Sequence, residues 1–434
     1  MIPLDRLYHF LADQVNRDML IYRWSPHGSK KAEDLLPLTN YKQNGEKFGA
    51  INPIMICHDQ EPLHYDLYNE SVMFDVLKWL FRKSTNLDAL EPMLREMAHW
   101  NLRARVELHN VYDKILLLHS EQNSQELDKF RALDFIPVYY WSHALIARDW
   151  FRYARHDPKL QYYNIQQDFL IYNRAWSGTR EYRLKFAEGL LNNKLIPQCR
   201  TTFSPHCNGT HYTQHKFINS VLAITRFDLD QHFIENTTDS SQSADYCTLD
   251  YQQCGIEVIL ETMMDDTRWH LTEKTLRPIA CGMPFILVST PGTLDYLRHY
   301  GFSTFEPYID ESYNLITDPV IRIQAVQAEM RRIATLPTHE KSQLFSKLRS
   351  IATRNCTIFF SDGFRQQVIN EYRTNLNIAL EELANYCNAK HLLQVKNLLD
   401  SIPGLRQDRM DHRNFIWQKV TAWLQGQNNP DDHW

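Results

Sequence analysis

Glycine is scarce in this sequence, with 13 glycines among 434 residues. Neither the P-loop pattern G-x-x-x-x-G-K-[ST] nor the dinucleotide fingerprint G-x-G-x-x-G occurs. The sequence therefore lacks the motifs that would identify an ordinary ATPase or an NAD-dependent enzyme. No apolar run approaches the length of a membrane span, and the first residues lack a basic region followed by a hydrophobic block. We therefore expect neither a membrane span nor a secretory signal.

Paired cysteine motifs and a strong excess of one charge are also missing. The 8 cysteines are scattered without C-x-x-C spacing, which is typical of reduced thiols and indicates a cytoplasmic protein. The net charge of −5 argues against a protein that coats nucleic acid by bulk electrostatics, although it leaves room for a local basic cleft. What is present is hydrophobic content of 43%, ample for globular cores, in a chain long enough for two domains.

Short apolar segments alternate with helical ones in the first part of the chain. The expected strands are 19–24, 53–57, 114–118 and 136–141. The expected helices between and after them are 71–81, 125–133 and 144–154. This alternation predicts a mostly parallel, doubly wound sheet.

A polar stretch with a proline, residues 155–161, is the expected linker to a second domain. Beyond it we expect strands at 168–172, around 223–225, at 256–260 and at 284–288, and helices at 179–191, 319–336, 341–352 and 362–389. Residues 203–250 are expected to hold long loops. The predicted division is an N-terminal Rossmann-like domain over 1–160, a C-terminal one over 161–389, and a helical extension over 390–434.

The most informative segment is 269–290, which reads as loop, short helix, glycine turn and buried strand. Glu273 and Lys274 fall on the first turn of that helix, directly after Thr272. Helix N-termini and the carboxyl ends of parallel strands converge where α/β folds bind anions. A lysine there can neutralise a departing diphosphate, and a glutamate can accept hydrogen bonds from sugar or ribose hydroxyls. The alternative is a surface helix cap, with Thr272 as N-cap and Glu273 as a first-turn acid.

The order of Thr272-Glu273-Lys274, then Arg277-Pro278 and Gly282-Met283-Pro284-Phe285, resembles the donor-binding segment of sugar-nucleotide-dependent glycosyltransferases, especially the fucosyltransferase-like and exostosin-like groups. The resemblance is strongest over 168–313 and weak before it. It implies a GT-B architecture, in which two Rossmann-like domains face each other across a cleft. With Trp141-Ser142-His143-Ala144 and Asp310-Glu311-Ser312-Tyr313, the sequence looks most like uncharacterised glycosyltransferases of large tailed phages and their bacterial relatives.

The same resemblance gives a role to the loop after the strand at 168–172. Asn173, Arg174 and Arg180 match a family pattern in which an arginine-bearing loop contacts the donor diphosphate, and Arg183 is a further, less direct match. Arginine suits this task because its planar fork donates two parallel hydrogen bonds to phosphate oxygens. The alternative is an exposed basic helix start. Arg277, at i+3 from Lys274, is on the same helix face and is expected to reach phosphate as well.

Activation of an acceptor hydroxyl needs a base, and carboxylates at the ends of parallel strands suit that role. Asp59 is the first candidate, followed by Glu61 and Glu121. Each of them also reads as an ordinary polar loop residue, and the resemblance does not choose among them because the N-terminal domains of these enzymes diverge with the acceptor.

Two motifs suggest a metal but receive less weight. Asp228-Leu229-Asp230 matches the D-x-D motif of the other large glycosyltransferase fold, but a three-residue match is frequent by chance. His206, Cys207, His211 and His215 suggest a zinc loop, but their spacing fits no standard pattern. We expect no metal, because positive side chains can take its place at the leaving group.

The predicted function is therefore metal-independent transfer of a sugar from a nucleotide-sugar donor to an acceptor hydroxyl, in the cytoplasm of a bacterial or phage-infected cell. The acceptor is a glycan or, since some phage enzymes glycosylate modified bases, DNA. One alternative is a catalytically silent protein of the same fold that binds nucleotide-sugars or polyanions. Another alternative is a phosphoryl-handling enzyme of a different α/β family. The absence of a glycine-rich phosphate loop argues against it.

Overall fold

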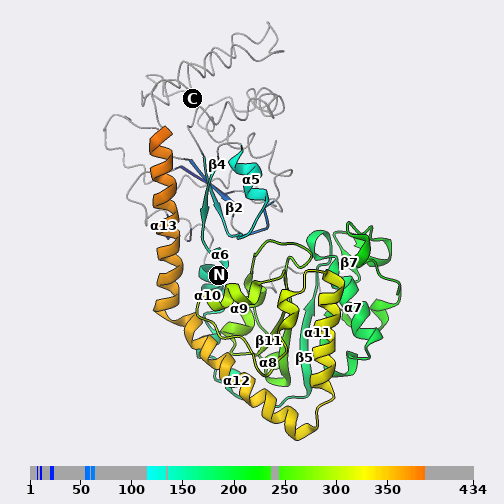
Figure 1. Ribbon diagram of the computed structural model, residues 1–434. Coiled ribbons are helices and arrows are strands. Elements are labelled where there is room, and N and C mark those ends of the chain that lie inside the picture. Colours follow the sequence, from blue (N-terminus) through cyan, green and yellow to red (C-terminus); the bar gives the residue numbers. More distant parts are fainter. Residues whose placement is uncertain are drawn as a thin grey trace, which may run out of the picture. The chain divides into compact units, whose positions relative to one another are not determined.

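The computed structural model describes residues 7, 10–11, 20–23, 54–58, 60–63, 115–132, 135–235 and 244–386. The chain divides into two compact units. The first-sheet unit comprises Pro3–Tyr140 and Asn370–Trp434, and the second-sheet unit comprises Trp141–Ile369 with Met1–Ile2. Each unit contains a parallel sheet with helices, so the predicted α/β class is confirmed (Figure 1).

The division between the units lies at Trp141, before the expected linker. Residues of that linker form two 3-10 turns inside the second-sheet unit, η2 (Ala154–His156) and η3 (Pro158–Gln161). The Asp157 carboxylate caps the second turn by accepting a hydrogen bond from the Lys159 amide at 2.9 Å. The predicted helical extension, 390–434, lies outside the described residues.

The first sheet has four parallel strands among the described residues, in the order β1-β2-β3-β4. They are β1 (Leu20–Arg23), β2 (Ile54–His58), β3 (Ile115–His119) and β4 (Phe135–Tyr139). Each lies within two residues of its predicted position. The side chains of Leu116, Leu117 and Leu118 are fully buried, as expected for a strand covered on both faces. Helix α5 (Glu126–Arg131) connects β3 to β4. The helix expected at 71–81 lies outside the described residues.

The second sheet has five parallel strands in the order β11-β10-β5-β6-β9. They are β5 (Gln167–Asn173), β6 (Cys199–Phe203), β9 (Ile234–Glu235), β10 (Cys254–Leu260) and β11 (Phe285–Val288). The strand expected around 223–225 does not form. Connecting helices are α7 (Tyr182–Asn192), α8 (Thr248–Gln253) and α9 (Glu273–Ala280). Every residue of β10 is buried, so this strand forms the core of the unit.

Helices α6 (Ser142–Trp150), α10 (Thr293–His299), α11 (Pro319–Ala334) and α12 (Thr338–Phe360) complete the second-sheet unit. From the end of α12 the chain continues into α13 (Asp362–Tyr386) (Figure 1). Helix α12 is longer than predicted at both ends. It packs closely on β10 at Gly255, where a Cβ atom would lie 2.6 Å from the Phe345 ring. A side chain at position 255 would therefore require the Phe345 ring to move.

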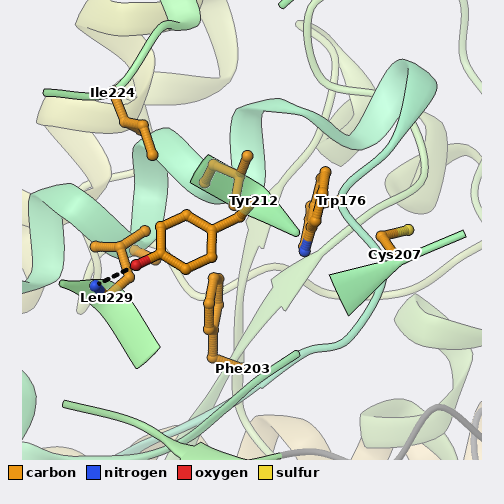
Figure 2. Packing of buried hydrophobic residues seen from close by; sticks show 8 residues of the cluster. Trp176, Phe203, Cys207, Tyr212, Ile224 and Leu229 are labelled. Atoms are coloured by element: carbon orange, nitrogen blue, oxygen red, sulfur yellow. Dashed lines mark hydrogen bonds between the residues drawn. The ribbon is translucent and has the colours of Figure 1, made fainter. Parts of the chain in front are cut away.

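The segment that follows β6 is more ordered than its polar composition suggested. Its side chains join residues of β6 and α7 in a buried apolar cluster around Trp176, Phe203 and Tyr212 (Figure 2). The Tyr212 hydroxyl accepts a hydrogen bond from the Leu229 amide at 3.0 Å, and the Trp176 indole N–H donates to the Ser204 carbonyl at 2.8 Å. The expected long loops of this segment, broken by two-residue strands and short 3-10 turns, therefore pack against β6 and α7.

Candidate functional site

The strand order of the second sheet reverses beside β5. From β5 the chain proceeds to β6 and β9 on one side, and it then returns to β10 and β11 on the other. The loops after β5 and β10, residues 174–181 and 261–272, consequently lead to opposite sides of the sheet. Open parallel sheets bind ligands outside the carboxyl ends of their strands at such a reversal. We call the ends of β5 and β10, these two loops and the N-terminus of α9 the second-sheet edge.

Arg183 joins the two loops of the second-sheet edge. Its buried guanidinium donates to the Ala175 carbonyl at 2.6 Å and to the Leu260 and Glu261 carbonyls at 2.6 and 2.9 Å. The Tyr182 hydroxyl donates to the same Glu261 carbonyl at 2.6 Å. Burial lowers the pKa of Arg183 from its ordinary value. These bonds hold the ends of β5 and β10 at a fixed spacing.

Glu261, directly after β10, organises the start of α9. Its fully buried carboxylate accepts hydrogen bonds from the Thr272 amide and hydroxyl, both at 2.9 Å, and from the Thr275 hydroxyl at 2.7 Å. Burial by itself raises the pKa of this carboxyl, but Lys274 and these hydrogen bonds outweigh burial, so the net direction is downward. Sequence reasoning missed Glu261, although a carboxylate ending an apolar strand is the signal that drew attention to Glu61 and Glu121.

Glu273 and Lys274 lie on the first turn of α9, as the sequence predicted. The Thr272 side chain caps the helix by accepting a hydrogen bond from the Lys274 amide at 3.3 Å. The Lys274 ammonium lies 2.8 Å from Oε1 of Glu273, 3.2 Å from the Thr272 hydroxyl and 3.4 Å from the Thr262 hydroxyl at the end of β10. The pair is not an exposed surface cap, since the side chains of Lys274 and Glu273 are 21% and 9% exposed. Lys274 therefore lies at the strand end beside the reversal.

His143, near the N-terminus of α6, lies against the same turn. Its Nε2 atom is 3.6 Å from Oε2 of Glu273, and its ring meets that of His270 edge-on at 5.5 Å between centroids. The Trp141 indole N–H fixes the start of α6 by donating to the Leu271 carbonyl at 2.9 Å. Burial lowers the pKa of His143 and so favours the neutral imidazole. The sequence offered no signal for the contact between His143 and Glu273, which are 130 positions apart.

The predicted residues of the β5 loop differ in burial. Asn173 is buried at the strand end, and its side-chain nitrogen donates to the Arg183 carbonyl at 3.1 Å. The Asn173 side-chain oxygen has no hydrogen-bond partner among the described residues. Arg174 and Arg180 lie half-buried in the loop that leads to α7. The structure thus brings all three to the carboxyl end of β5, next to the end of β10.

Arg277 does not reach the second-sheet edge. Its guanidinium is buried one turn along α9, where it pairs with Glu257 in the middle of β10 at 2.7 Å. It also donates to the Tyr251 hydroxyl at 3.0 Å and lies 4.5 Å above the centre of the Tyr172 ring. Burial alone would lower the pKa of Arg277, but Glu257 and the two tyrosines hold it well above its usual value. These internal partners hold Arg277 away from the second-sheet edge.

The carboxylates predicted as bases lie in the first-sheet unit. Asp59 is outside the described residues, and Glu61 is half-buried just after β2. Glu121 is buried after β3, where its Oε1 atom accepts a hydrogen bond from the Leu63 amide at 2.6 Å. Glu121 thus ties the loop after β2 to the end of β3. Its role as a base stays a prediction.

The residues of the two metal motifs have other partners. Asp228 pairs with Arg226 at 2.7 Å and with His232 at 3.1 Å, and Asp230 accepts a hydrogen bond from the Tyr212 hydroxyl at 2.8 Å. In the zinc-like set, Cys207 belongs to the apolar cluster of Figure 2, and His215 pairs with Glu181 at 3.1 Å. Within the part of the chain that the structure describes, no three His, Cys, Asp or Glu side chains are arranged to hold a metal ion.

Comparison with known proteins identifies no relative: no family model, no curated protein and no solved structure matches this chain. Among the described helices, none is both long and apolar enough to cross a bilayer.

Proposed function

We propose that this protein is a glycosyltransferase of the GT-B type that binds a nucleotide-sugar donor at the second-sheet edge. The observation that carries the proposal is the place of Lys274, at the N-terminus of α9 and 3.4 Å from the Thr262 hydroxyl in the loop that follows β10, beside the reversal of strand order. Read from β9 to β11, the order of the sheet is 3-2-1-4-5 in chain sequence. This order matches the first five strands of the dinucleotide-binding order 3-2-1-4-5-6, which supports the proposal.

In the proposed donor complex, Lys274 and the arginines of the β5 loop surround the diphosphate. The lysine charge and the N-terminal dipole of α9 favour an anion at the same point, and both gain strength as negative charge develops on the leaving group. Arg174 and Arg180 add forked donors from the neighbouring loop. Glu273 accepts a hydrogen bond from a hydroxyl of the sugar or ribose. Asn173 offers a buried side-chain oxygen at the same strand end.

The acceptor side of the proposal rests on the first-sheet unit, whose described strands run in the order β1-β2-β3-β4 without the reversal of the second sheet. Asp59, Glu61 and Glu121 remain the candidates for the base that removes the proton of the acceptor hydroxyl. We propose a glycan or a modified DNA base as the acceptor. Positive side chains replace a divalent metal at the leaving group, so activity should survive chelation, and loss of transfer on addition of EDTA would contradict this part of the mechanism.

A thermal-shift screen of the full chain against nucleoside diphosphates and nucleotide-sugars tests the donor site. A ligand at 100 times its dissociation constant stabilises the folded state by about 2.7 kcal/mol, which is easily seen as a higher melting temperature. Lys274→Ala and Arg180→Ala should abolish most of this shift.

Lys185→Ala is the matched control for Lys274→Ala. Lys185 is 24% exposed and pairs with a buried glutamate, Glu188, at 2.9 Å, much as Lys274 pairs with Glu273. Because the Lys185 ammonium is bonded to Glu188 and to the Ala223 carbonyl, both at 2.9 Å, its replacement should leave the ligand shift intact. Unchanged shifts in Lys274→Ala and Arg180→Ala would refute the donor site. Ligand binding with no sugar transfer or hydrolysis would instead identify a catalytically silent binding protein.

A further inference from the structure

The carboxylate of Glu273 lies between two possible positive partners. Its Oε1 atom is 2.8 Å from the Lys274 ammonium, and its Oε2 atom is 3.6 Å from Nε2 of His143. Lys274 is the more accessible of the two, with 21% of its side chain exposed against 5% for His143. A ligand that approaches this turn would therefore meet Lys274 before His143.

The groups that face His143 come from several elements. Ser142, on the same helix, has its hydroxyl 3.4 Å from Nδ1, and the His270 ring packs edge-on from the loop before α9. Burial lowers the pKa of His143 most strongly, and Lys274 lowers it further, whereas Glu273 and Glu261 raise it. The two carboxylates favour the protonated imidazole. The charge of Lys274 opposes them and so helps to keep this imidazole neutral.

We propose that His143 is a positioning residue that takes over the ion pair with Glu273 when a diphosphate engages Lys274. The proposal rests on the donor site described above. An anion at Lys274 offsets the charge that balances Glu273, and a buried carboxylate without a counter-charge is costly. His143 restores the balance by binding one proton from solvent at its unprotonated ring nitrogen, and no bond between heavy atoms changes. Glu273 then stays in place for a donor hydroxyl while Lys274 turns to phosphate.

The first test needs no ligand, because Lys274→Met removes the same charge that a phosphate would offset. The full chain is labelled with ¹³C-histidine, and the His143 signal is assigned by its loss in His143→Gln. In the wild-type protein His143 should titrate below the ordinary histidine value of about 6.5. In Lys274→Met it should titrate at higher pH than in the wild type, and in the control Lys185→Met it should not move. An unchanged His143 titration in Lys274→Met overturns the proposal.

The second test measures protons taken up when inorganic pyrophosphate or a nucleoside diphosphate binds. Calorimetry at pH 7 in two buffers of different ionisation enthalpy gives this number for the wild type and for His143→Gln. The wild type should take up more protons than the variant, and its affinity should rise as the pH falls from 8 to 7. Equal uptake in both proteins overturns the role of His143 but leaves the donor site standing. If no diphosphate binds, the donor site fails and the role of His143 fails with it.

Discussion

The carboxyl ends of the two sheets carry different chemistry. In the first sheet the strands follow one another in chain order, and the side chains at their ends are imidazoles and a carboxylate, His58, His119 and Glu121. In the second sheet the order reverses beside β5, and cationic side chains lie next to the reversal. Under the proposed function, the second edge would bind the anionic donor, and the first edge would supply the base that deprotonates the acceptor.

Buried carboxylates nevertheless perform one task at both edges. Glu121 accepts the Leu63 amide, and Glu261 accepts the Thr272 amide, so each ties a loop to a strand end. Glu261 accepts four hydrogen bonds, from Thr262, Thr272 and Thr275, and it lies near Lys274. Loss of the Lys274 charge is therefore expected to act directly on Glu261.

The largest expected effect is on the free energy of unfolding, and it distinguishes Arg277 from Lys274 on the same helix, α9. Arg277→Met should lower the free energy of unfolding by about 3–5 kcal/mol, because it leaves Glu257 buried without its partner. Urea denaturation checks this value, and the double variant Glu257→Gln with Arg277→Met should recover part of the loss. Lys274→Ala should cost far less stability but remove the ligand response. A stable Arg277→Met protein that no longer binds nucleotide would place Arg277 in the donor site after all.

The next prediction compares the two strand-end carboxylates. Glu121→Ala should cost about 1–3 kcal/mol, because the buried Leu63 amide loses its acceptor, and Glu121→Gln should cost less because the amide oxygen still accepts. Glu261→Gln should cost more than Glu121→Gln, since its new NH₂ group would face donors from Thr262, Thr272 and Thr275. Denaturation midpoints of the three variants decide the order. If Glu121→Gln folds normally yet transfers no sugar, Glu121 gains support as the base.

One part of the pH dependence of stability should come from His143 at the second edge. Burial lowers the pKa of His143, so between pH 6.5 and the lower folded-state value the unfolded chain binds a proton that the folded protein does not. Stability is therefore complete above pH 6.5 and falls below it, by at most about 1.4 kcal/mol per pH unit for one group. Chemical denaturation at pH 7.5, 6.5 and 5.5 measures the slope. His143→Gln should flatten it, and an identical slope in the variant would contradict the neutral buried imidazole.

Local sequence patterns predicted much of this arrangement. The apolar runs located β2, β3, β5 and β10 within two residues, because a buried parallel strand must be apolar on both faces. Thr272 was recognisable as an N-cap from its residue type and its place before the helix.

The partners of charged side chains were not predictable in the same way. The i+3 spacing placed Arg277 near Lys274, but each helical residue advances about 1.5 Å along the axis, so Arg277 lies a turn farther from the strand end. There it meets Glu257, which read simply as part of an apolar strand. The contact of His143 with Glu273 joins residues 130 positions apart, and no helical or strand period connects them. The sequence located elements well, whereas tertiary packing decided which charges met.

The smallest expected effect concerns Asp228, whose motif suggested a metal. The Asp228 side chain is 38% exposed, and hydrogen bonds from Arg226 and His232 hold its pKa below the ordinary value. An exposed ion pair of this kind contributes little to stability, because water and salt screen it. Asp228→Asn should therefore leave the melting temperature, nucleotide binding and any response to Mn²⁺ unchanged. A loss of nucleotide binding in Asp228→Asn, or binding that requires Mn²⁺ and fails in this variant, would move the donor site away from Lys274 and end the contrast between a cationic and a carboxylate edge.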